Sequence, residues 1–196
     1  MKQFMKKILT MVVVATLIIG AIPLYVNASE KDIVILYTND VHCGINGYEK
    51  LAAYRAQLIS EGYEVLTVDL GDAIQGEVLG TLTQGSAIVD LMNATGYDYA
   101  IPGNHEYDYG VERFLELEEK EADYTYLCSN WVKTADNKPV QEPYKVVEIN
   151  DMKIGFVSVA TPETYTKSTC SIFLSIKSCL HTGKNISLIP PLVNMR

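Results

Sequence analysis

The sequence predicts an α/β layered fold with a mixed sheet. Short β-rich runs alternate with stretches whose apolar residues recur at helical spacing, in the order β-α-β-α-β-α-β-β-β. This alternation favours parallel strands joined by helical crossovers, and the final strand pair adds an antiparallel hairpin. The composition, 48% hydrophobic and 20% charged, is that of a globular domain.

The first strand–helix–strand unit lies between residues 32 and 70. Asp32–Tyr37 is a β-rich run that predicts a buried strand, and Glu64–Leu70 predicts the second strand. Between them, Tyr48–Ile59 predicts a helix that Gly62 ends. The apolar residues of this helix at helical spacing are Tyr48, Leu51, Ala52, Leu58 and Ile59.

Two further helices follow the same pattern. Ser86–Thr95 predicts a helix that Gly96 ends, and Tyr97–Ile101 predicts a short third strand. Val111–Lys120 is amphipathic, with several glutamates on its polar face. The inward-facing residues of these two helices are expected to be Ile88, Leu91, Met92, Val111, Phe114 and Leu115.

The predicted sheet ends with a fourth strand and a hairpin. Tyr124–Leu127 is the fourth strand. Tyr144–Ile149 and Met152–Ala160 are β-rich runs separated by Asn150-Asp151, a pair typical of a tight hairpin turn. The 13 tyrosines of the chain are scattered, and we interpret them as packing residues.

Both ends of the chain depart from this pattern. Residues 1–28 combine three early lysines, an apolar run and a cleavage site after Ala28, which is typical of a signal peptide. The alternative is an uncleaved anchor, so we expect a secreted or cell-envelope protein that contacts the membrane only through this segment. Residues 29–167 then form the domain. Residues 168–196 contain no Asp or Glu and are an unassigned tail, either poorly packed or, as we favour, frameshifted.

The charge and the cysteines restrict the function only in part. A net charge of -8 argues against binding of a nucleic-acid polymer, which needs clustered Lys and Arg. It is compatible with a small phosphate-ester substrate, because a metal centre can dominate the local field. The four cysteines allow three complete pairings, among which the sequence does not choose.

Three loops that follow predicted strands are rich in metal-ligand residue types. These loops are Thr38–Gly44, Asp69–Gly76 and Gly103–Asp108. In open α/β sheets ligands bind beyond the carboxyl ends of the strands, so we expect the three loops to converge. A pair of divalent cations held there would neutralise a phosphate ester and activate water against it.

The residue types suggest how the ligands divide. Asp40 and His42 can hold one metal ion, Asp72 can bridge two ions, and Asn104 can bind the second ion through its amide oxygen. Mixed Asp, His and Asn ligands suit Zn, Mn or Fe better than Ca or Mg. His105 is then free to protonate a leaving group or to hold the phosphate.

Each residue also has a simpler explanation. Asp72 and Asn104 follow glycines in ordinary turn dipeptides, and His42 could be a hydrogen-bonded core residue. Asp108 could orient His105 or could cap the helix near Val111. The order of the three loops favours the metal site. Cys43 and Glu106 lie among the candidates without a predicted role.

These stretches resemble the motifs of the bacterial 5'-nucleotidase and 2',3'-cyclic-nucleotide phosphodiesterase family of calcineurin-like metallophosphoesterases. The matching runs are T-N-D-V-H, V-D-L-G-D-A-I-Q-G, G-N-H-E-Y-D and Ala160–Thr164, within Asp32–Lys167. The resemblance implies a four-layered α/β/β/α catalytic domain with two divalent metal ions. It assigns the first metal to Asp40 and His42, the bridge to Asp72, the second metal to Asn104, and a catalytic dyad to His105 and Asp108.

The chain also departs from that family. The family's remaining ligands are histidines of later loops, whereas this chain has only His42, His105 and, in the tail, His181. The second domain, which holds the nucleoside base in the family, has no counterpart here. We therefore expect a truncated, secreted hydrolase of nucleotide phosphate esters. The alternatives are a non-catalytic remnant that folds poorly or binds one metal weakly, and a hydrolase of other esters, including sulfur compounds.

Overall fold

The computed structural model describes residues 32–161, 164 and 174–176. The predicted signal peptide, residues 1–28, and most of the unassigned tail lie outside these residues. In the described part of the chain, none of the helices is long and apolar enough to cross a lipid bilayer.

A four-stranded parallel sheet forms the centre of the described domain. Its strands are β1 (Ile33–Thr38), β2 (Glu64–Asp69), β3 (Tyr99–Ala100) and β4 (Thr125–Tyr126), paired in the order β1-β2-β3-β4. Each neighbouring pair is parallel, so the carboxyl ends of all four strands lie at one edge. The predicted α/β fold is confirmed, although β3 and β4 are shorter than expected.

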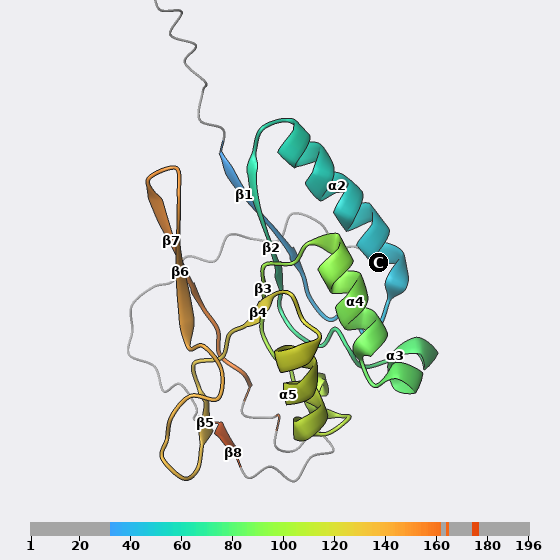
Figure 1. The fold of residues 1–196 in the computed structure, drawn as a ribbon, viewed down its shortest axis with the longest axis vertical. Coiled ribbons are helices and arrows are strands. Elements are labelled where there is room, and N and C mark those ends of the chain that lie inside the picture. Colours follow the sequence, from blue (N-terminus) through green and yellow to red (C-terminus); the bar gives the residue numbers. More distant parts are fainter. Residues whose placement is uncertain (1–31, 162–163, 165–173, 177–196) are drawn as a thin grey trace, which may run out of the picture. The chain divides into compact units, whose positions relative to one another are not determined.

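Three helices connect these strands and cover one face of the sheet (Figure 1). They are α2 (Tyr48–Ser60), α4 (Ser86–Thr95) and α5 (Val111–Lys120). The last two have the predicted bounds, because Gly96 ends α4 in the left-handed conformation and Gly110 precedes α5. Ile59, one of the apolar residues at helical spacing, is 45% exposed, because it follows the buried Leu58 by one position around α2.

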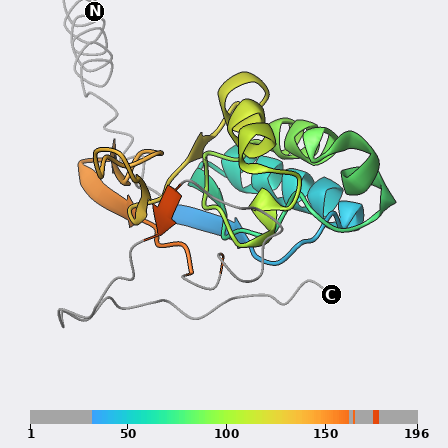
Figure 2. The same ribbon diagram turned by 90° about the horizontal axis from the view of Figure 1, so that it is seen from below.

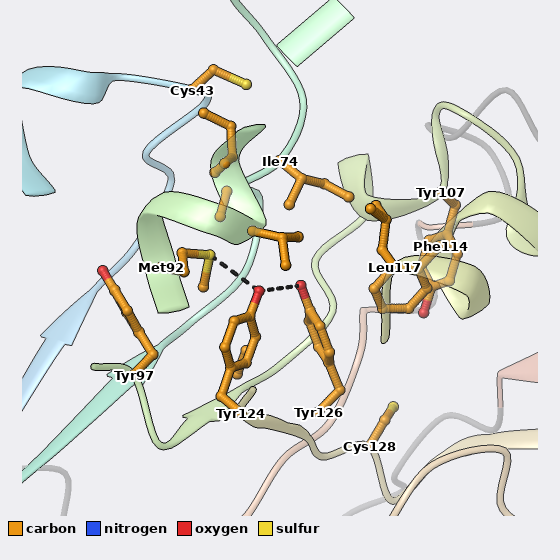
Figure 3. Close-up of a cluster of buried hydrophobic side chains, with 14 of the residues drawn as sticks. Cys43, Ile74, Met92, Tyr97, Tyr107, Phe114, Leu117, Tyr124, Tyr126 and Cys128 are labelled. Atoms are coloured by element: carbon orange, nitrogen blue, oxygen red, sulfur yellow. Dashed lines mark hydrogen bonds between the residues drawn. The ribbon is translucent and has the colours of Figure 1, made fainter. Parts of the chain in front are cut away.

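Aromatic side chains fill the core between helices and sheet (Figure 3). The Tyr124 hydroxyl donates a hydrogen bond to the Met92 sulfur at 3.3 Å and lies 3.4 Å from the Tyr126 hydroxyl. Phe114 packs edge-on against Tyr126, with ring centroids 4.9 Å apart, and stacks on Trp131 at 6.0 Å. These tyrosines therefore pack the core, as predicted.

A hairpin covers the other face of the sheet, as Figures 1 and 2 show. Strands β6 (Tyr144–Ile149) and β7 (Met152–Val157) are antiparallel and joined by Asn150-Asp151, both left-handed. Their inner residues pack against Val68, Tyr99 and Leu127 of the sheet side. Among the described residues, helices, sheet and hairpin thus form three successive layers of the predicted four-layered fold.

Some elements were not predicted from the sequence. The short helix α3 (Val78–Thr83) and strand β5 (Trp131–Lys133) were missed, and β5 pairs antiparallel with β8 (Leu174–Ile176) from the unassigned tail. Two 3-10 turns, η1 (Ile45–Gly47) and η2 (His105–Tyr107), lie within or next to the candidate loops.

Strand β1 was predicted to be buried, and this was wrong. It lies at the edge of the described sheet, with Ile35 44% exposed and Tyr37 39% exposed. An apolar run does not distinguish a central strand from an edge strand, because that difference depends on which other strands pair with it.

Candidate metal centre

The first two candidate loops are joined by backbone hydrogen bonds beyond β1 and β2. The amides of Asp40, His42 and Cys43 donate to the carbonyls of Gly71, Asp72 and Ala73, at 3.1, 2.9 and 2.9 Å. The loops therefore extend the parallel pairing of the strands past their ends, which brings the predicted ligands of both loops to one edge of the sheet.

The third loop, after β3, touches the second through Asp72. The His105 amide donates to Asp72 Oδ1 at 2.8 Å. A Cβ on Gly71 would lie 2.7 Å from the Gly103 nitrogen, and a Cβ on Gly103 would lie 2.3 Å from Asp72 Oδ1. Both positions need glycine, because a side chain at either would force the two loops apart.

Left-handed backbone conformations gather in these loops. Asp40, His42, Cys43 and Asp72 have φ values of 55°, 45°, 61° and 59°. Such residues cost about 1–3 kcal/mol each when they are not glycine, and they cluster at functional sites. The strain therefore lies at the point where Asp40, His42 and Asp72 are predicted to bind metal.

Donor atoms from all three loops meet at that point. His42, Asp72 and His105 each offer one ligand atom, and these atoms lie within 4.8 Å of one another. Asp40 Oδ1 lies 3.4 Å from His42 Nε2. The rings of His42 and His105 are 5.0 Å apart and nearly perpendicular. Two imidazoles with carboxylates form a donor set that suits a first-row divalent ion.

Gln75 orients the imidazole of His42. His42 Nδ1 lies 3.3 Å from the Gln75 carbonyl oxygen and 3.3 Å from Gln75 Oε1, both acceptors. A neutral imidazole that donates from Nδ1 to either oxygen has Nε2 available as a metal ligand. This role of Gln75 was not predicted, because a glutamine in a loop has many possible partners.

His105 and Asp108 form a close pair. His105 Nδ1 lies 2.7 Å from Asp108 Oδ2, and this hydrogen bond raises the pKa of the imidazole above its ordinary value. The alternative role of Asp108 as helix cap is not supported, since the cap position of α5 is Gly110 and has no side-chain hydrogen bond. The contact is compatible with the prediction that Asp108 orients His105, which stays a prediction.

Asn104 carries a buried amide nitrogen without a hydrogen-bond partner among the described residues. Buried polar atoms are almost always paired, so such an atom beside a donor cluster needs an explanation. The two ends of an amide are exchangeable by a flip of the side chain. An Asn104 oxygen turned toward an ion would remove the anomaly, so the residues present fit a bound metal ion.

Two buried carboxylates support the loops. Asp69, at the end of β2, accepts hydrogen bonds from the Thr38 hydroxyl at 2.7 Å and the Gly71 amide at 2.9 Å, and burial raises its pKa to about 6. Glu106, only 1% exposed, accepts from backbone amides of the second and third loops. Both were missed as functional residues, since neither residue type reveals such contacts in sequence.

A cavity opens beside the first loop, and His42, Asp72 and His105 do not line it. It has a volume of about 630 Å³, in the range of small-molecule sites, and includes Asp40 in its wall. Polar groups of Asn39, Lys50 and Tyr97 also line it. The cavity therefore gives a small ligand room next to the first candidate ligand.

Curated relatives of the chain are nucleotidases. The chain is 31% identical to the 5'-nucleotidase of Bos taurus over 170 residues, which is 76% of this chain and 29% of the bovine protein. Among solved structures, the NAD nucleotidase of Haemophilus influenzae has a TM-score of 0.65 at 26% identity, covering 74% of this chain and 29% of that chain.

The 5'-nucleotidase precursor of Thermus thermophilus shares the fold, with a TM-score of 0.66 at 22% identity over 74% of this chain and 32% of that chain. The chain thus spans less than a third of the length of each of these relatives. Residues 33–170 match the family described as calcineurin-like phosphoesterase. The chain belongs to the calcineurin-like phosphoesterase family.

Proposed function

We propose that this chain carries the metal-binding loops of an extracytoplasmic phosphoesterase that hydrolyses nucleotide phosphate monoesters. The observation that carries the proposal is the convergence of His42, Asp72 and His105 from three separate loops to within 4.8 Å. The names of the bovine and H. influenzae relatives support nucleotides as the substrate class. The signal-peptide pattern of residues 1–28 supports a location outside the cytoplasm.

The proposed ligands divide between two ions. Asp40 and His42 would hold the first ion, Asp72 would contact both, and Asn104 would hold the second through its amide oxygen. Bound divalent ions would neutralise phosphoryl oxygens and activate water. A neutral His42 that donates from Nδ1 to Gln75 would have Nε2 free for an ion, and the amide of His105 donates to one oxygen of Asp72, leaving its other oxygen for an ion.

His105 would donate a proton to the leaving oxygen of the ester. In the imidazolium form both ring nitrogens carry protons, and Asp108 accepts the one on Nδ1. The proton on Nε2 is then available to the substrate, and the carboxylate of Asp108 stabilises the charged ring until transfer. In this proposal His105 is a catalytic residue and Asp108 is a residue that positions it.

The test is hydrolysis of a nucleotide by the purified chain supplied with Mn²⁺. We expect release of phosphate from adenosine 5'-monophosphate, and a loss of about a hundredfold or more in turnover for His105→Ala, the usual size of an acid–base contribution. His181→Ala is the matched control, because that histidine lies in the tail outside the described residues, and it should leave turnover unchanged.

Two outcomes would contradict the proposal. Equal turnover of the His105→Ala variant and the parent chain would remove His105 from the mechanism. A parent chain that binds no Mn²⁺ and hydrolyses neither the nucleotide nor an aryl phosphate would instead support the non-catalytic alternative. Hydrolysis of the aryl phosphate alone would keep the phosphoesterase and reject nucleotides as its substrate.

A further inference from the structure

Glu106 is a buried acid that the proposed mechanism does not use. It lies in η2 between His105 and Tyr107, and its side chain is 1% exposed. Burial of a carboxylate costs several kcal/mol unless hydrogen bonds compensate for the lost water. The location of those hydrogen bonds therefore shows what the buried acid does.

The carboxylate of Glu106 joins the second loop to the third. Oε1 accepts from the Ala73 amide at 2.8 Å. Oε2 accepts from the Asp72 amide at 2.9 Å and from the Gly103 amide at 2.6 Å. Three backbone donors on two oxygens require an acceptor at both positions, which a carboxylate supplies and an amide does not.

The connection continues to the first loop. Asp72 and Ala73 donate to Glu106 through their amides. Their carbonyls accept hydrogen bonds from the amides of His42 and Cys43. A shift of the Asp72–Ala73 segment would therefore move His42 as well as Asp72. All three hydrogen bonds of Glu106 are therefore to backbone amides. Glu106 acts on the backbone that carries the ligand side chains, and not on those side chains themselves.

We propose that Glu106 is a positioning residue, which sets the distances among the ligands of all three loops by binding the backbone of the second and third. The inference rests on the proposed metal centre and deepens it. Mutation of a residue that holds metal ligands in place without binding the metal itself typically lowers metal affinity 10–100-fold.

The test compares Glu106→Gln with Glu118→Gln in the full chain. Glutamine keeps the size of the side chain but replaces one acceptor oxygen with an NH₂ group that faces a backbone N–H. Glu118 is the matched control, because it is half-buried and likewise accepts a hydrogen bond, from Gln141 at 3.0 Å, yet it lies on α5 outside the loops. Binding of Mn²⁺ is measured by calorimetry, and amide hydrogen exchange is measured without metal.

We expect Glu106→Gln to weaken Mn²⁺ binding about 10–100-fold. It should also speed amide exchange at Asp72, Ala73 and Gly103 while leaving exchange in α4 unchanged. Glu118→Gln should alter neither measurement. A purely structural role would lower the unfolding temperature without this local pattern. If Glu106→Gln does not fold, Glu106→Asp keeps the charge but shortens the reach, and should show the same local exchange and a smaller loss of affinity.

Unchanged affinity and unchanged loop exchange in a folded Glu106→Gln variant would overturn the inference while the proposed function stands. A parent chain that binds Mn²⁺ in a Glu106-dependent manner but hydrolyses no phosphate ester would reject the function and keep the inference. A parent chain that binds no Mn²⁺ would reject both.

Discussion

Asp69 ends β2 directly below the second loop, and its carboxylate is 1% exposed. It accepts hydrogen bonds from the Thr38 hydroxyl and the Gly71 amide, while that hydroxyl also lies 2.8 Å from the Tyr97 hydroxyl. Burial raises the pKa of Asp69 from its ordinary value of 3.8 to about 6. Between these values the folded chain keeps a proton that the unfolded chain has released.

This shift predicts a pH-dependent stability. Because the folded chain binds the extra proton, the free energy of unfolding should fall as pH rises from 3.8 through about 6, by on the order of 3 kcal/mol. Asp69→Asn should remove this contribution, because its amide can donate to Thr38 and accept from Gly71 without titrating. Glu106, whose pKa burial raises to about 7, should keep its own contribution to the slope. Urea unfolding of the metal-free chain between pH 4 and pH 7 measures both.

Equal slopes for Asp69→Asn and the parent chain would mean that other groups cause the pH dependence. Asp136→Asn is the control, because the Asp136 side chain is 43% exposed and lies on a turn beside Lys138. This variant should keep the parent slope. The pH prediction concerns the metal-free chain, so Asp69→Asn does not test the proposed roles of the metal ligands.

At this scale the sequence predicted part of the site. Asp40, His42, Asp72 and His105 could be found because ligand residue types follow successive strands, and parallel strands end at one edge. Their roles stay predictions. Glu106 and Gln75 could not be found, because their partners are backbone atoms and one ring nitrogen that only the folded chain brings near.

The β6–β7 hairpin is held on the four-stranded sheet by the side chains of its inner face. Phe156 packs on Tyr99 with ring centroids 5.0 Å apart, and Val147 lies in the same cluster. The outer face is apolar as well, with Tyr144 60% and Val157 67% exposed. A two-stranded hairpin is marginal alone, so contacts of the inner face must hold it.

Phe156→Ala should therefore destabilise the chain by about 2–4 kcal/mol, since it removes an aromatic contact and leaves a void against the sheet. Val157→Thr, the neighbouring residue on the outer face, should change stability by less than about 0.5 kcal/mol. Chemical denaturation of both variants measures the difference. Similar losses of unfolding free energy for Phe156→Ala and Val157→Thr would show that the inner face of the hairpin does not hold it on the sheet.

The helices were easier to predict than the strands. Helices α4 and α5 were predicted with the right bounds because their apolar residues recur at helical spacing over ten residues, and Gly96 ends α4. Strands β3 and β4 have only two residues each, and α3 has six. Elements this short do not contain enough apolar repeats to show whether the chain is a helix or a strand. The exposed position of β1 depends on pairing, which a single strand's sequence does not contain.

For the whole molecule, bound ions should contribute to stability. A ligand that binds only the folded state stabilises it by about 2.7 kcal/mol at a free concentration 100 times its dissociation constant. Addition of Mn²⁺ should therefore raise the unfolding temperature of the parent chain, and a chelator should reverse the change. Asp72→Asn should abolish the effect, because the proposed bridge contacts both ions.

Differential scanning calorimetry of the metal-free and Mn²⁺-supplied chains measures this effect. Asp136→Asn, which also removes one negative charge from a chain of net charge -8, should keep the full response to Mn²⁺. An equal response from Asp72→Asn would mean that Mn²⁺ acts through the general acidity of the surface and that the proposed bridge is wrong.

The backbone bonds between the ligand loops have a consequence for ion exchange. Peptide groups of Asp40, His42 and Cys43 join the first loop to the second. Because these bonds form with the fold, we expect the ligand loops to be in place before an ion binds, so that an arriving ion has only to shed its water. Entry and departure should then be rapid compared with unfolding, so the identity of the resident ion would follow the supply of metals around the protein.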